Sequence, residues 1–135
     1  MIANLQDTLA HLMFQRTKQE KSPANAELYR TLINEEMQEF LAEPNDTPNQ
    51  FKELCDLLWV IVQFANQMGY DLEDGMTALC DEYRSKFYTE DGRYQPLFRE
   101  DGKLLKNSGF RKANFGKFFK NWYWKVVAYI EATAY

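Results

Sequence analysis

Two short acidic stretches are the residues of this sequence best suited to chemistry. The first is Glu35-Glu36-Met37-Gln38-Glu39, and the second is Glu53-Leu54-Cys55-Asp56. In a helix, residues three or four positions apart project from neighbouring points of one surface, so each stretch presents paired carboxylates. Carboxylates packed closely repel one another and raise each other's pKa unless a cation lies among them. The two stretches therefore indicate a site for a hard, oxygen-preferring cation, Mg²⁺ or Mn²⁺.

A cation held by carboxylates suits phosphate chemistry. The metal ion clamps phosphate oxygens, and a spare carboxylate can orient or deprotonate a water molecule. A zinc site of nitrogen and sulfur ligands is disfavoured, because the sequence has one His and two Cys. A di-iron carboxylate bundle needs Glu-x-x-His pairs, and His11 is not part of such a pair.

The alternative interpretation is an ordinary solvated helix surface. Glutamate is a common residue at exposed helix positions, and the first stretch alone would fit that description. Glu53 and Asp56 fit it less well, because they lie in the most apolar segment of the chain, where an unpaired charge is costly. Aspartate also disfavours the middle of a helix. The two stretches together favour the metal site.

Two helices joined by a short turn must position these carboxylates. Apolar residues at helical spacing predict one helix that ends before Glu43 and another over about residues 49–68. Pro44 and Pro48 interrupt the pattern between them, and Gly69 stands where a helix-ending glycine is expected. The short connection makes the helices antiparallel neighbours and brings the two acidic stretches to the same level. Residues 49–68 are apolar nearly all round, which is typical of a central helix.

The rest of the chain predicts an all-α bundle of four to five helices. Helical spacing indicates further helices over about residues 2–18, 72–87 and 114–133. Asp101-Gly102 lies between two apolar stretches, which predicts a small β-hairpin near residues 94–106. No Gly/Ser linker interrupts the sequence, so residues 1–135 are expected to form a single domain.

Composition and charge exclude several classes of protein. The net charge of −4 argues against a protein that coats nucleic acid, although residues 103–135 are basic and aromatic. The longest apolar run, residues 57–62, is too short to span a bilayer. Two cysteines cannot form a disulfide framework and no secretory signal is apparent, so we expect a cytoplasmic protein with neither a nucleic-acid nor a membrane partner.

The two acidic stretches resemble the signature of a known superfamily. Their Glu-Glu-x-x-Glu and Glu-x-x-Asp patterns, together with residues 32–40, 52–61 and 68–71, are similar to the MazG-like all-α nucleoside triphosphate pyrophosphohydrolases. Residues 84–87 and 94–106 look like those of short, phage-encoded members, which would place the protein in the cytoplasm of a host cell. The resemblance covers about residues 12–110.

The resemblance implies hydrolysis of an NTP or dNTP between the α- and β-phosphorus, giving a nucleoside monophosphate and pyrophosphate. Carried over by position, the Mg²⁺ ligands would be Glu36, Glu39, Glu53 and Asp56. Glu35 would be a further ligand or the catalytic group that activates water.

The resemblance also indicates residues for binding the substrate. Lys86 matches a lysine that contacts phosphate in the family, which gives it a catalytic and substrate-binding role. Relatives usually carry an Asn three residues earlier, where this sequence has Tyr83, so the contact with phosphate or sugar made there is in question. Lys103 and Lys106 are candidate phosphate contacts because of their charge, and an exposed surface role is the alternative.

Among phage-type relatives, a MazZ-like subgroup acts on dGTP, and dGTP or GTP is the lead substrate here. A dUTP or dCTP hydrolase, or a house-cleaning enzyme for damaged nucleotides, would use the same carboxylates. A non-catalytic helical interaction protein, with the basic aromatic residues 115–129 as its contact surface, is the alternative from another class. The family assembles as dimers or tetramers, so a homodimer or homotetramer is expected.

Overall fold

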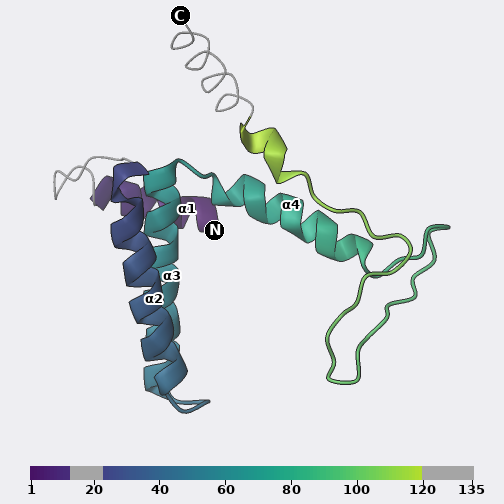
Figure 1. The fold of residues 1–135 in the computed structure, drawn as a ribbon, viewed down its shortest axis with the longest axis horizontal. Coiled ribbons are helices and arrows are strands. Elements are labelled where there is room, and N and C mark those ends of the chain that lie inside the picture. Colours follow the sequence, from purple (N-terminus) through teal and green to yellow (C-terminus); the bar gives the residue numbers. More distant parts are fainter. Residues whose placement is uncertain (13–22, 120–135) are drawn as a thin grey trace, which may run out of the picture. The chain divides into compact units, whose positions relative to one another are not determined.

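The computed structural model describes residues 1–12 and 23–119. Within these ranges the chain forms four α-helices: α1 (Ile2–His11), α2 (Ala26–Ala42), α3 (Pro48–Met68) and α4 (Leu72–Ser85) (Figure 1). Two short 3₁₀ helices, η2 (Pro23–Asn25) and η3 (Phe115–Phe119), accompany them. The prediction of an all-α fold is confirmed. The continuation of the first predicted helix to residue 18, and most of the helix predicted over 114–133, lie outside the described residues.

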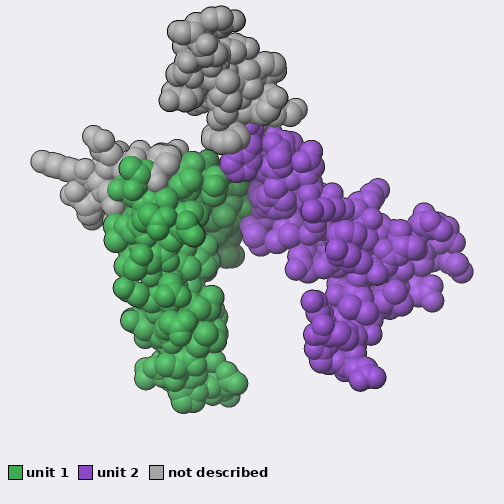
Figure 2. Space-filling model, in the orientation of Figure 1, with its two compact units in different colours: residues 1–73 green, residues 74–135 purple. Residues whose placement is uncertain are grey.

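The chain divides into two compact units, residues 1–73 and 74–135, which are coloured separately in Figure 2. We describe each unit by itself, and the single-domain organisation stays a prediction. No helix in the described ranges is both long enough and apolar enough to cross a membrane.

The antiparallel pair α2–α3 forms most of unit 1 (Figure 1). The residues between the helices specify the turn. Thr47 caps α3, because its Oγ1 accepts a hydrogen bond from the backbone N–H of Gln50 at 3.1 Å, and Pro48 occupies the first helical position, which suits a residue without an N–H. Asp46 adopts the left-handed conformation (φ 60°), and its N–H donates to the Gln50 side chain at 2.9 Å. The prediction of two antiparallel helices joined by a short turn is confirmed.

The other end of α3 is fastened to α1. Gly69 ends α3 with a φ of 77°, a conformation that glycine adopts without strain. The side chain of Gln6 on α1 donates to the Asn66 side chain at 3.1 Å and to the Tyr70 carbonyl at 2.9 Å, and it accepts from the N–H of Leu72 at 2.8 Å. One buried amide therefore joins α1 to the connection between α3 and α4.

The apolar core of the described residues lies entirely in unit 1. Its buried members are Leu9, Tyr29, Leu57, Val60, Val62 and Ala65. A second stripe on α3 is exposed, and it consists of Phe51, Leu54, Leu58 and Ile61. The core of unit 1 therefore covers only part of the apolar surface of α3.

Unit 2 contains most of α4 and the loops that follow it. No apolar side chain is buried in the described part of this unit, and its buried residue is Ser85 at the end of α4. Residues 107–113, which we call the strap, run back along the end of α4 and are held to it by hydrogen bonds. Hydrogen bonds and contacts between partly exposed aromatic rings, rather than a buried apolar core, therefore order this region.

The β-hairpin predicted near residues 94–106 is wrong. A turn does form at Asp101-Gly102, where Gly102 has a φ of 92°, but the flanking segments share a single antiparallel bridge between Phe98 and Leu104. No strand occurs among residues 1–12 and 23–119. Pro96 cannot donate to a ladder, and an isolated two-stranded ribbon is only marginally stable in water. The Asp101-Gly102 dipeptide does form the turn, but the pairing beside it is much shorter than a hairpin.

Candidate metal centre

Three carboxylates from two helices meet on one side of the α2–α3 pair. Glu36 comes from α2, whereas Glu53 and Asp56 come from neighbouring turns of α3. One oxygen of each carboxylate lies within 4.8 Å of the others, and all three residues are half-buried. The capped turn between the helices sets this register, because it brings the middle of α2 opposite the second turn of α3.

The electrostatics of this cluster are unfavourable for three charged carboxylates. Burial raises the pKa of Glu36 above its ordinary value of 4.5, and the charges of Glu39, Asp56 and Glu53 raise it further. Burial is also the main cause that raises the pKa of Glu53, and the nearby ammonium of Lys52 partly offsets it. Glu36 and Glu53 therefore retain protons more readily than isolated glutamates do.

Two oxygens of the cluster have no partner in the described part of the chain. Oε2 of Glu36 and Oε2 of Glu53 are shielded from solvent and accept no hydrogen bond. A buried carboxylate oxygen without a partner is costly, and a bound cation would satisfy both. An all-oxygen donor set of this kind fits Mg²⁺ or Mn²⁺.

A lysine already supplies positive charge at one edge of the cluster. The ammonium of Lys52 forms a short hydrogen-bonded ion pair with Asp56, one helical turn away on α3. The hydrogen bond to Asp56 is the main cause that raises the pKa of Lys52. No role was predicted for Lys52, although the Lys-x-x-x-Asp spacing is a recognisable sign of such a pair.

The structure places the other two predicted acidic residues differently. Glu39 lies one turn after Glu36 on α2, and its charge helps to raise the pKa of both Glu36 and Glu53, so it adjoins the cluster. Glu35 is exposed on α2. Their roles, like those of the other site residues, stay predictions.

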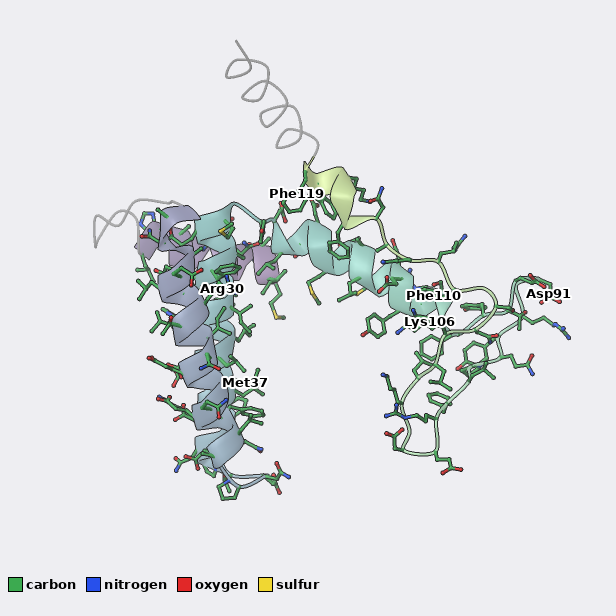
Figure 3. The ribbon with its side chains drawn as sticks, viewed as in Figure 1. Arg30, Met37, Asp91, Lys106, Phe110 and Phe119 are labelled. Atoms are coloured by element: carbon green, nitrogen blue, oxygen red, sulfur yellow. The ribbon has the colours of Figure 1, made fainter. Side chains whose placement is uncertain are left out.

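The lysines and the tyrosine predicted to bind substrate lie in unit 2. Lys86 follows the last residue of α4, and its ammonium lies 4.1 Å from the ring centroid of Tyr83. Lys106 lies 4.9 Å from the ring centroid of Phe110, and these two residues are labelled beside the end of α4 in Figure 3. The backbone of Lys103 closes the turn by accepting a hydrogen bond from the N–H of Arg99 at 2.8 Å.

Sequence reasoning missed Phe110, which is half-buried beside two of these lysines. No local pattern identifies it, because the ring approaches Lys86 across 24 positions of the sequence. The strap that carries Phe110 is held by backbone hydrogen bonds, and these depend on how the chain folds back along α4.

Comparison with known proteins identifies a matching family model and a similar solved structure. The phosphoribosyl-ATP pyrophosphohydrolase family model matches residues 4–82, which include both acidic stretches. A solved structure described as a cyanophage S-2L MazG-like pyrophosphohydrolase, bound to dGDP and three catalytic Mn²⁺ ions per active site, matches with a TM-score of 0.53 at 16% identity. The match covers 80% of this chain and 97% of the other. No curated protein sequence matches significantly.

The solved structure supports a shared fold, and the family match extends over more than half of the 135 residues. The chain therefore belongs to the phosphoribosyl-ATP pyrophosphohydrolase family within the MazG-like all-α superfamily, and it is an enzyme of the pyrophosphohydrolase class.

Proposed function

We propose that the chain hydrolyses a nucleoside triphosphate to the monophosphate and pyrophosphate, with dGTP or GTP as the lead substrate. The observation that carries the proposal is the cluster of Glu36, Glu53 and Asp56, with its two unpartnered buried oxygens. Such a cluster favours a bound cation, and a divalent cation held by oxygens is suited to binding phosphate groups. In the reaction, the oxygen of a water molecule bonds to the α-phosphorus and the bond from the α-phosphorus to the α–β bridging oxygen breaks. Pyrophosphate leaves with the bridging oxygen, and a proton of the water is released.

Each acidic residue is proposed to have its own task. Glu36, Glu39, Glu53 and Asp56 would hold Mg²⁺ or Mn²⁺, which when bound would neutralise charge on the phosphate oxygens. The exposed Glu35 would complete the ligand set or accept a proton from the attacking water. Lys52 would neutralise part of the cluster whenever the cation is absent, since it pairs with Asp56.

The proposed preference for guanine rests on similarity to a solved structure. It is supported by the cyanophage relative, which is described as bound to dGDP. The family model is named for phosphoribosyl-ATP, so that compound belongs among the candidate substrates. We place the reaction in the cytoplasm, of a host cell if the protein is phage-encoded.

A substrate panel tests the proposal. The protein is incubated with each NTP and dNTP, dUTP and phosphoribosyl-ATP among them, in Mg²⁺ or Mn²⁺, and the products are separated by ion-exchange chromatography. We expect equal amounts of dGMP and pyrophosphate from dGTP, with slower turnover of the other bases. Faster turnover of a pyrimidine or damaged nucleotide would contradict the guanine preference, and release of orthophosphate with a diphosphate would contradict the cleavage position.

Substitutions within the cluster separate this proposal from a non-catalytic interaction protein. Glu39→Gln and Asp56→Asn should each abolish turnover while the circular dichroism spectrum stays that of the wild type. Glu27→Gln is the matched control, because Glu27 is an exposed residue of α2 that pairs with Arg30 at 3.1 Å, away from the cluster. If the Glu39 and Asp56 variants keep every measured property, the non-catalytic alternative is supported instead.

We also propose that the protein assembles as a homodimer or homotetramer through α3. The exposed stripe of Phe51, Leu54, Leu58 and Ile61 recurs every three or four residues, which is the spacing of a helix–helix seam. Phe51 and Leu54 also line a cavity of about 600 Å³ with Phe40, next to the α2–α3 turn. An apolar stripe and cavity of this kind are typical of a surface that another copy covers.

Light scattering after size-exclusion chromatography tests the assembly. The wild type should elute with the mass of two or four chains, and Leu58→Glu should shift it toward one chain. Leu97→Glu is the control, because Leu97 is similarly exposed but lies in unit 2. A wild type with the mass of one chain would contradict the proposal.

A further inference from the structure

Two lysines of unit 2 gather at one aromatic ring. The ammonium groups of Lys86 and Lys106 lie 6.0 Å and 4.9 Å from the ring centroid of Phe110. Lys86 also lies 4.1 Å from the ring of Tyr83, so both charges rest on aromatic faces. In the described residues, neither ammonium has a carboxylate partner. Two like charges at one ring repel each other and are left without a counter-ion.

Three arginines of the same unit are paired differently. Arg84, Arg93 and Arg99 each form an ion pair with an aspartate two or three positions away in the sequence. Unit 2 is therefore not short of carboxylates for its cations. Lys86 and Lys106 differ from these arginines because they share an aromatic ring, that of Phe110, instead of each pairing with a carboxylate.

An aromatic partner leaves an ammonium group able to bind an anion. A lysine ammonium carries three N–H donors, and a carboxylate partner would occupy some of them and neutralise the charge. A ring attracts the ammonium through its face without accepting a strong hydrogen bond or carrying a charge. The donors of Lys86 and Lys106 therefore stay available to a ligand with several acceptor oxygens.

The strap fixes the position of Phe110. On one side of Phe110, the N–H of Gly109 donates to the carbonyl of Tyr88 at 3.0 Å. On the other side, the N–H of Arg111 donates to the hydroxyl of the buried Ser85 at 2.9 Å. Hydrogen bonds of the residues before and after Phe110 thus hold its ring beside the end of α4, which Lys86 directly follows.

The approach of the strap to α4 is very close. A Cβ atom at position 109 would lie 2.5 Å from the carbonyl oxygen of Tyr88 and 2.6 Å from that of Thr89. Both are backbone atoms, so the strap could not keep its place with a larger residue there. Farther along, the N–H of Ala113 donates to the side chain of Glu82 at 3.1 Å, which extends the attachment.

We propose that Phe110 is a positioning residue that holds Lys86 and Lys106 together as a binding pair for the phosphate chain of a nucleotide. The strap carries the ring, and Tyr83 offers Lys86 a second aromatic face. The ligand class is a linear polyphosphate, because its adjacent phosphate groups offer acceptor oxygens and negative charge to two ammonium groups at once. The inference names a phosphate contact of the proposed reaction and rests on that proposed function for its biological role.

Pyrophosphate is the probe that tests the pair without turnover. Calorimetric titration of the metal-free protein in EDTA should show one binding event per chain. Phe110→Leu should weaken this binding roughly three- to tenfold, because each lysine loses a cation–π partner. Phe110→Tyr should restore it, because a phenol ring keeps the aromatic face. Unchanged affinity in Phe110→Leu, or no rescue by tyrosine, would overturn the proposal.

A matched control is Phe118→Leu. Lys117 lies 5.2 Å from the ring of Phe118, so this change removes another lysine–phenylalanine pair of the same unit. It should leave pyrophosphate affinity as in the wild type, and an equal loss in both leucine variants would contradict the inference. If Phe110→Leu does not fold, Lys106→Gln is used instead, and unchanged affinity in that variant would overturn the proposal.

Two further readouts separate this inference from the proposed reaction. Glu36→Gln should remove turnover and keep pyrophosphate binding, since Glu36 belongs to the carboxylate cluster of unit 1. In turnover assays, Phe110→Leu should raise KM more than it lowers kcat, and Phe110→Tyr should restore KM. If pyrophosphate binding follows the lysines but no nucleotide is hydrolysed, the proposed reaction fails and the binding pair stands.

Discussion

Replacing Glu36 by glutamine should stabilise the metal-free protein. Oxygens of Glu36, Glu53 and Asp56 lie within 4.8 Å of one another, and the Oε2 of Glu36 has no partner among the described residues. Glutamine keeps the shape of glutamate, removes its charge and gains an NH₂ group that can donate to a neighbouring carboxylate. Most substitutions destabilise proteins, so the direction of this effect is diagnostic.

The magnitude follows from the distances in the cluster. Two unit charges at the separation seen here repel by about 1 kcal/mol in a water-like dielectric, and Glu36 faces two such partners. Lys52 already neutralises part of Asp56, and salt screens the rest. We therefore expect a net gain of about 1 kcal/mol, equivalent to a rise in Tm of about 3–6 °C for a chain of this length.

Mn²⁺ should reverse the order of stability of the wild type and Glu36→Gln. At a free concentration of about 100 times its Kd, an ion that binds only the folded protein stabilises it by about 2.7 kcal/mol. Wild type should gain this increment, whereas Glu36→Gln should gain little because it lacks one ligand. The variant would then be the more stable protein in EDTA and the less stable one in Mn²⁺.

Thermal denaturation followed by circular dichroism, in EDTA and in a Mn²⁺ series, measures both effects. Glu27→Gln is the control, because it makes the same chemical change on α2 at an exposed residue outside the cluster. Its Tm should stay within about 1–2 °C of the wild type in EDTA, since exposed ion pairs contribute little, and its response to Mn²⁺ should be unchanged. A lower Tm for Glu36→Gln in EDTA, or equal stabilisation of Glu36→Gln and wild type by Mn²⁺, would refute the reasoning.

Three further predictions concern the pH response of the carboxylate cluster, the ion pair of Lys52 and the attachment of the strap. The pKa values of Glu36 and Glu53 are raised above 4.5 in the folded state, so the folded protein binds more protons than the unfolded chain. Denaturant titrations in EDTA should therefore show these groups adding stability as pH falls from 7 toward 4.5. A constant difference in the free energy of unfolding between wild type and Glu36→Gln over that range would contradict this. Lys52→Gln should lower the Tm in EDTA and enlarge the Tm increment from Mn²⁺, because the cation that competes for Asp56 is removed, and an unchanged increment would count against that competition. Gly109→Ala should destabilise unit 2 by about 1–3 kcal/mol, because the added Cβ would meet two carbonyl oxygens. Gly75→Ala on α4, where the added Cβ would lie 3.7 Å from Phe115, should instead stabilise unit 2 by about 0.5–1 kcal/mol. Hydrogen exchange measures both effects, and equal effects of the two substitutions would contradict the close approach of the strap to α4.

The α2–α3 pair could be predicted closely from the sequence, because local signals mark its boundaries. Pro48 and Gly69 occupy the first and capping positions of α3 in the structure, as their chemistry requires. Once both helices and a short turn are given, the approach of Glu36 to Glu53 and Asp56 follows from the register alone. Helix periodicity and turn chemistry are short-range properties, which a single sequence records directly.

The contacts of unit 2 could not be predicted in this way. The strap is ordered by hydrogen bonds such as Arg111 to Ser85, which join residues 26 positions apart and leave no periodic pattern. The hairpin was overestimated because the Asp101-Gly102 turn was given more weight than Pro96 and the missing cover for two isolated strands. The exposure of the stripe containing Phe51 and Leu58 was also unpredictable, because an apolar helix shows the same pattern whether its own chain or another copy covers it.

The most direct test of the central claim is a ³¹P NMR time course of dGTP hydrolysis with excess Mg²⁺ and again with excess EDTA. The three triphosphate signals should be replaced by those of dGMP and pyrophosphate only when Mg²⁺ is present, and Asp56→Asn should show no change over the same interval. Signals of orthophosphate and dGDP, or equal hydrolysis in EDTA, would contradict a metal-dependent pyrophosphohydrolase built on the carboxylates of α2 and α3.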